Sequence, residues 1–114
     1  MSKRDPRVRL LHMREYAQKA VAMVGGQTRA SMDADEKLRL ALTRLLELVG
    51  EAASHVPTEI QARYPEIPWQ KVIGTRHRLI HGYDFVDCDI LWDTITLSLP
   101  GLIATLDRIL GEGT

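Results

Sequence analysis

The residues best suited to chemistry lie together between positions 75 and 83. The run Arg76-His77-Arg78-Leu79-Ile80-His81-Gly82-Tyr83 places two arginines, two histidines and a tyrosine within eight residues. Histidine can take or give a proton near neutral pH, and the planar guanidinium of arginine matches a phosphate. Together these side chains could cleave a phosphodiester by proton transfer and charge stabilisation. RNA carries its own nucleophile, the 2′-hydroxyl, so such a site would need no metal.

The spacing of Arg76 and His81 limits how one chain could bring them together. On a regular helix, residues five positions apart point about 140° away from each other. Three arrangements would solve this: a helix end that distorts at Gly82, side chains that converge from different directions, or a second copy of the chain that completes the site. The third suits a small bundle, because a symmetric dimer would create a cleft and double its positive charge.

Other interpretations of the same residues stay open. Arginines and histidines on helices are often solvated surface residues, and Tyr83 could be a half-buried aromatic. His77 and His81 also have the four-residue spacing used by zinc proteins, with further possible ligands nearby, but no H-E-x-x-H or C-x-x-C pattern is present. These further candidates are Asp84, Asp87, Cys88 and Asp89.

Glu51 is a second residue of interest, because it follows Gly50 inside an apolar helical run. A carboxylate near a core usually has a partner, and we expect Arg76 or Arg78 to be that partner.

Apolar spacing and capping residues predict helices along the whole chain. Leucine, valine and alanine recur at steps of three and four, and Asp, Thr, Pro and Gly stand where helices begin or end. The sequence has no sustained alternation typical of strands. The expected helices run from Pro6 to the stop at Gly25-Gly26, from the Asp33 cap to Pro57, from Thr58 to before Pro65, from Pro68 to Gly82, and from about Asp87 to Leu110 with a kink at Pro100.

The predicted fold class is therefore all-α. We expect an antiparallel bundle of four long helices and one short helix, forming a homodimer of single domains that span residues 1–114. The length of 114 residues allows one core and no second domain. The lone Cys88 rules out an internal disulfide, and no apolar stretch is long enough to cross a membrane. The N-terminus from Met1 to Arg9 is charged rather than followed by an apolar signal core, so we expect a cytoplasmic protein.

Charge is balanced overall but uneven along the chain. Fifteen basic and fifteen acidic residues give a net charge of zero, which argues against a protein that coats nucleic acid with a broad cationic surface. Residues 1–19 hold six bases and two acids, a net charge of +4, whereas residues 84–114 hold six acids and one base, a net charge of −5. These ends either offset each other by packing together or present surfaces of opposite sign.

The motif from Arg76 to Tyr83 resembles the R-x-x-x-x-H-x-Y motif of the HEPN superfamily, in particular its HepT-like branch. Similar residues of that branch occur in the same order elsewhere, and the resemblance extends from about Arg7 to Leu110. They include Gly50-Glu51-Ala52, Ile67-Pro68-Trp69, Val86-Asp87, Trp92, and Leu99-Pro100 with Leu102.

This resemblance implies a homodimeric α-helical bundle with the motif lining the cleft between subunits. It also implies a metal-independent endoribonuclease, the toxin of a toxin–antitoxin pair whose partner is a minimal nucleotidyltransferase. Arg76 and His81 would be catalytic, and Tyr83 would receive AMP from the transferase. His77 stands where the branch often has asparagine, and both side chains can hydrogen-bond to a phosphate.

Our leading hypothesis is an endoribonuclease toxin without a cofactor or metal. In it, His81 is the general acid or base, Arg76 stabilises the phosphate, His77 assists, and Arg78 and Glu51 support the site. RNA, a second copy and the transferase are the expected partners. The alternative is a catalytically silent protein that binds nucleotide or acts as a scaffold for the transferase.

Overall fold

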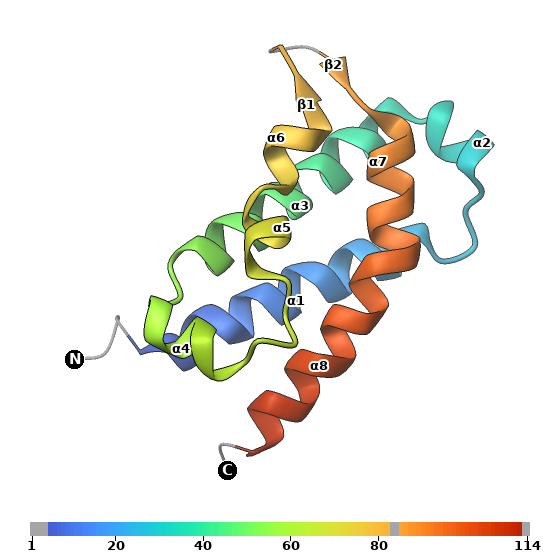
Figure 1. Cartoon of the computed structure of the whole chain (residues 1–114). Helices are drawn as coiled ribbons and strands as arrows, with labels where there is room; N and C mark the ends of the chain where they lie inside the picture. The colour runs from blue at the N-terminus through green and yellow to red at the C-terminus, as the bar shows by residue number, and fades with distance from the viewer. Residues whose placement is uncertain (1–4, 83–84, 113–114) are drawn as a thin grey trace.

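Two helices of 19 residues, α1 (Pro6–Val24) and α3 (Glu36–Ser54), pack along each other in opposite directions (Figure 1). The computed structural model describes residues 5–82 and 85–112. Asp5 caps α1 by accepting the Arg7 N–H at 2.9 Å, as the sequence predicts. The predicted cap of the second helix was wrong by two residues: Asp35 caps α3, and Asp33 ends the short helix α2 (Arg29–Asp33), which the sequence analysis missed.

The predicted helix over 68–82 is wrong in its extent. After α4 (Thr58–Arg63), the chain forms two five-residue helices, α5 (Trp69–Ile73) and α6 (Thr75–Leu79), separated at Gly74. α5 crosses α3 at Gly50, where an added Cβ would lie 3.1 Å from the carbonyl oxygen of Val72. Glycine at position 50 therefore permits a close approach between α5 and α3 that a larger residue would obstruct.

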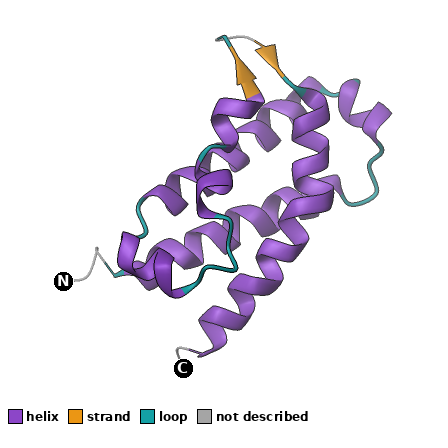
Figure 2. Cartoon of the chain, viewed as in Figure 1, coloured by secondary structure: helices purple, strands orange, loops and turns teal. Residues whose placement is uncertain are grey.

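A small β-hairpin follows α6, with its first strand where the sequence predicted helix and its second between the predicted helices. Strand β1 (Ile80–His81) pairs antiparallel with β2 (Phe85–Val86), and Figure 2 shows the pair projecting from the helical body. Gly82 has a φ of +71°, a left-handed conformation that glycine adopts without strain. Strands of two residues are too short to produce a visible alternation, so the sequence pattern could not reveal them.

The C-terminal rod consists of α7 (Cys88–Asp93), a π-helical turn η2 (Thr94–Ser98) and α8 (Leu99–Glu112). The departure from α-helical bonding lies in the turn just before Pro100, where the Leu99 N–H bonds to the Thr94 carbonyl. Since proline has no N–H to donate, the ladder is already incomplete at this point. The all-α class is confirmed, but the four long helices are wrong, because the fourth is replaced by α5, α6 and the hairpin.

The basic and acidic segments near the two ends of the chain meet where α1 packs against α8. Arg14 of α1 forms an ion pair with Asp107 of α8 at 3.0 Å, and Arg7 donates to the carbonyl oxygen of Leu110 at 2.8 Å. Part of the basic and acidic excess is therefore offset at the α1–α8 contact. Within residues 5–82 and 85–112, no helix is long and apolar enough to cross a membrane.

Candidate functional site

The motif residues lie at the junction of α6 and the hairpin. Arg76 and His77 are on α6, whereas His81 is on β1, because the helix ends at Leu79 and Ile80 is already extended. The helix thus ends three residues before Gly82, and the helical angle expected between Arg76 and His81 does not apply. The backbone change at Ile80 gives the two side chains separate supports, a helix for the cation and a strand for the imidazole.

Arg76 is oriented by a carboxylate from α3. Its Nε donates to Oε2 of Glu47 at 2.8 Å, while 68% of the Arg76 side chain remains exposed. The Glu47 side chain is only 20% exposed, and its other oxygen lies 3.7 Å from Nη1 of Arg44. Because Glu47 uses the Nε position, the outer edge of the Arg76 guanidinium stays available to an anion.

The predicted role of Glu51 as the carboxylate partner of Arg76 or Arg78 is wrong. Glu51 is exposed, and its carboxylate lies 3.9 Å from Nδ1 of His55 one helical turn later. Glu47 fills that role instead. No signal in the sequence separates the two acids, because Glu47 and Glu51 lie one helical turn apart on the same side of α3, and it is the contact with Arg76 of α6 that selects Glu47.

His81 is exposed on the hairpin and faces its cross-strand neighbour. Its ring lies 5.9 Å from the ring of Phe85, centroid to centroid, at a tilt of 54°. Within the part of the chain that the structure describes, no hydrogen bond engages the His81 ring nitrogens. They are therefore available for proton transfer to a bound molecule.

The other predicted site residues have different positions. His77 is exposed on α6, and its side chain has no hydrogen bond to the described residues. Tyr83, the predicted site of modification, lies outside the described residues, as does Asp84. Among the residues described, no three His, Cys, Asp or Glu side chains lie close enough to hold a metal ion together.

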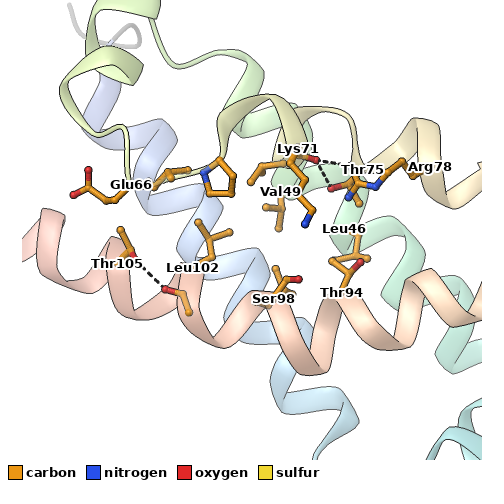
Figure 3. Close-up of a pocket in the computed structure, with 15 residues that line it drawn as sticks. Leu46, Val49, Glu66, Lys71, Thr75, Arg78, Thr94, Ser98, Leu102 and Thr105 are labelled. Carbon is orange, nitrogen blue, oxygen red and sulfur yellow. Dashed lines mark hydrogen bonds between the residues drawn. The ribbon is translucent and has the colours of Figure 1, made fainter.

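Arg78 points away from this site, toward a cavity. Its Nη1 donates to the carbonyl oxygen of Lys71 at 3.0 Å, and its side chain lines a cavity of about 370 Å³ between α5, α6 and the η2–α8 rod (Figure 3). The floor is aliphatic, with Leu46, Val49 and Leu102. None of Arg76, His77 and His81 is among the described residues that line it. The structure therefore separates the two arginines that the sequence grouped.

Residues 13–109 match the family described as Ribonuclease HepT-like, which is most of the chain. The chain belongs to the HepT-like family. A relative from Thermococcus cleftensis, named "Probable ribonuclease HepT", is 36% identical over 75 residues, covering 66% of this chain and 68% of that protein.

Other HepT-like relatives cover nearly the full length. A Caldanaerobacter subterraneus protein whose name describes it as a "Putative RNase" is 32% identical over 107 residues, covering 94% of this chain and 96% of its own. A similarly named Methanocaldococcus jannaschii protein is 29% identical over 112 residues, covering 98% of this chain and 93% of its own. No solved structure matches the chain.

Proposed function

We propose that this HepT-like protein is a metal-independent endoribonuclease that acts as the toxin of a toxin–antitoxin pair. The observation that carries the proposal is the motif surface: an exposed Arg76 oriented through Nε by Glu47, next to a strand that presents His81 without a hydrogen-bonded partner among the described residues. Family membership and relatives named as ribonucleases support the same activity.

The reaction follows from the chemistry of these two side chains. His81 accepts the proton of the RNA 2′-hydroxyl as the 2′-oxygen attacks the adjacent phosphorus. The bond from phosphorus to the 5′-oxygen breaks, and that oxygen takes up a proton. The products are a 2′,3′-cyclic phosphate and a 5′-hydroxyl. The Arg76 guanidinium stabilises the negative charge that accumulates on the phosphorane oxygens.

A second copy of the chain would supply what one copy lacks. A single imidazole cannot donate a proton until it has accepted one from the 2′-hydroxyl. The leaving 5′-oxygen, however, needs its proton while the bond to phosphorus is breaking. In a homodimer with both motifs in one cleft, one His81 acts as the base and the other as the acid, and both His77 side chains assist by hydrogen bonding to the phosphate.

Inhibition would act on the same cleft. A minimal nucleotidyltransferase partner transfers AMP from ATP to the Tyr83 hydroxyl and releases pyrophosphate. The added nucleotide places a bulky anion where the RNA phosphate binds. Repulsion between this group and the RNA phosphate, together with the loss of space, would block cleavage.

The test is the breakdown of total bacterial RNA by purified protein in EDTA. His81→Ala should lower the rate at least about a hundredfold, the lower end of what a general acid or base contributes. His55→Ala is the matched control, since His55 is an exposed histidine outside the motif, and it should cleave normally. Synthetic RNA that has 2′-deoxy sugars should resist cleavage. Equal rates for wild type and His81→Ala would refute the assignment.

Mass spectrometry tests the regulatory part. Protein co-expressed with an active nucleotidyltransferase encoded next to it should gain one adenylyl group on Tyr83, and Tyr83→Phe should gain none. Protein that leaves RNA intact in EDTA yet binds the transferase would instead favour the silent scaffold.

A further inference from the structure

The carboxylate of Glu47 lies between two exposed arginines from different elements. Oε2 accepts from Nε of Arg76 at 2.8 Å, and Oε1 lies 3.7 Å from Nη1 of Arg44, three residues earlier on α3. The two arginine side chains are 67% and 68% exposed, whereas Glu47 is 20% exposed. The acid is thus the sheltered member of the group, and both cations face solvent.

This arrangement decides which atoms are available for an anion. An arginine side chain held at Nε keeps the edge formed by Nη1 and Nη2 free, and that edge matches two phosphate oxygens. Glu47 also reduces the repulsion between the two guanidinium groups, because it neutralises one of their two charges. The group keeps a net positive charge, and the hydrogen bond to Glu47 orients the donors of Arg76.

We propose that Arg44, Glu47 and Arg76 form a two-phosphate binding unit for single-stranded RNA. Arg76 contacts the scissile phosphate, Arg44 contacts a neighbouring phosphate of the same strand, and Glu47 is a positioning residue that orients Arg76. The inference rests on the proposed ribonuclease function for its catalytic part. Its binding part, the contact of Arg44 with a phosphate, stands on the geometry alone. Arg44 lies outside the motif from Arg76 to Tyr83.

Single-stranded RNA is the substrate class that suits this surface. In-line attack by the 2′-oxygen requires rotation about the RNA backbone, which a paired A-form helix prevents. The unit has two positive groups rather than a broad cationic face, so it suits a few adjacent phosphates on a flexible strand.

The binding part is tested in the His81→Ala protein, so that the RNA stays intact. The probe is a fluorescent pool of random-sequence single-stranded oligoribonucleotides, and the dissociation constant is measured over a series of salt concentrations. Each phosphate contact in single strands contributes about 0.7 to the slope of log affinity against log salt. Arg44→Gln should therefore flatten the slope by about 0.7.

Arg108→Gln is the matched control for this series. Arg108 is also an exposed arginine held by carboxylates, but it lies on α8 and pairs with Glu66 and Glu112. It should leave the slope unchanged. A slope that is unaffected by Arg44→Gln, or equally reduced by Arg108→Gln, would overturn the binding unit.

The positioning role of Glu47 is tested by Glu47→Gln in the active protein. If Glu47 only repelled RNA, the variant without its charge would bind RNA more tightly and cleave it at least as fast as the wild type. If Glu47 is a positioning residue, Glu47→Gln should instead lower kcat about tenfold or more, with RNA affinity unchanged or tighter. Glu47→Asp, which keeps the charge, should recover part of the rate. The melting temperature of each variant shows that it is folded.

The outcomes separate the two proposals. Wild-type cleavage with full activity of Glu47→Gln overturns the positioning role and leaves the ribonuclease proposal intact. Equal inactivity of wild type and His81→Ala overturns the ribonuclease proposal and with it the positioning role, while the salt series still decides whether Arg44 binds a phosphate.

Discussion

Arg76 and Arg78 stand two residues apart on α6, yet they belong to different regions of the molecule. Arg76 is exposed, lies against Glu47 of α3 and leaves its outer edge to solvent. Arg78 is half-buried, bonds to the carbonyl oxygen of Lys71 and lines the cavity under α5 and α8 (Figure 3). The Glu47 carboxylate orients Arg76, whereas Arg78 donates a hydrogen bond to a backbone carbonyl.

The difference comes from the break at Gly74. A helix of five residues leaves most of its terminal carbonyls without intrahelical donors. The Lys71 carbonyl accepts from the Thr75 hydroxyl at 3.1 Å and from Arg78 at 3.0 Å, so these two side chains cap the end of α5. The guanidinium of Arg78 is therefore engaged in a hydrogen bond that stabilises the fold. Arg76 has no such bond to the described backbone, and its outer edge can donate to a ligand.

Truncating each arginine in turn should give the largest difference between the two regions. Arg76→Ala should lower the rate of RNA cleavage about 10²- to 10³-fold, by loss of transition-state charge stabilisation, and should change the unfolding free energy by less than about 0.5 kcal/mol, as for most surface substitutions. Arg78→Ala should lower cleavage by less than about tenfold but destabilise the fold by about 1 kcal/mol, the usual worth of a hydrogen bond. Cleavage assays in EDTA and urea unfolding measure both quantities.

Equal losses of cleavage from Arg76→Ala and Arg78→Ala would contradict the comparison. The sequence motif would then describe the site better than the contacts do.

Much of the fold follows from the sequence because the long helices have strong local signals. Asp5 with Pro6 begins α1, and Gly25-Gly26 ends it, as expected from capping chemistry. The break at Gly74 had no comparable signal. An isolated glycine inside an apolar helical pattern is compatible with a continuous helix, and here the contact of α5 with α3 decides the outcome.

The sequence proposes residues for the site, but the structure shows contacts between them that the sequence does not predict. Arg76 and His81 could be proposed from the sequence because they lie within one short motif and have distinctive chemistry. Glu47 is 29 positions away from Arg76, and only the packing of α6 on α3 brings them together. The prediction of Glu51 failed for the same reason, since Glu51 and Glu47 lie one turn apart on the same side of α3 and the sequence does not show which turn α6 contacts.

Gly50→Ala tests the packing that keeps the two arginines on different sides. The added methyl would lie 3.1 Å from the Val72 carbonyl oxygen, a backbone atom, so α5 would have to move away from α3. We expect a destabilisation of about 1–3 kcal/mol, typical of overpacking. Because Arg78 is hydrogen-bonded to Lys71 of α5, a movement of α5 should disturb the contacts of Arg78 more than those of Arg76. Urea unfolding measures the effect.

Gly101→Ala is the control for this substitution. Nothing lies within 4 Å of a Cβ built at Gly101 in α8, so alanine should stabilise that helix by about 0.5–1 kcal/mol. If the two variants were equally stable, the close approach at Gly50 would not be what fixes α5.

The smallest expected effect concerns Glu66, at the opposite end of the cavity from Arg78 (Figure 3). A hydrogen bond from its own backbone N–H, followed by the Arg108 guanidinium, lowers the pKa of Glu66 below its ordinary value of 4.5. The folded state thus favours the ionised carboxylate. This stabilisation is fully present above pH 4.5 and is lost as the pH falls through the lower folded-state pKa.

Glu66→Gln should therefore melt slightly below wild type at neutral pH, and the difference in melting temperature should shrink on acidification below about pH 4.5. A difference that stays constant or widens would contradict the assignment. The same variant should cleave RNA at the wild-type rate. Glu66 is a control for Glu47, because it also pairs with an exposed arginine, Arg108, that lies outside the motif surface. If Glu47→Gln lowers RNA cleavage and Glu66→Gln does not, the loss of an ion pair alone does not explain the effect.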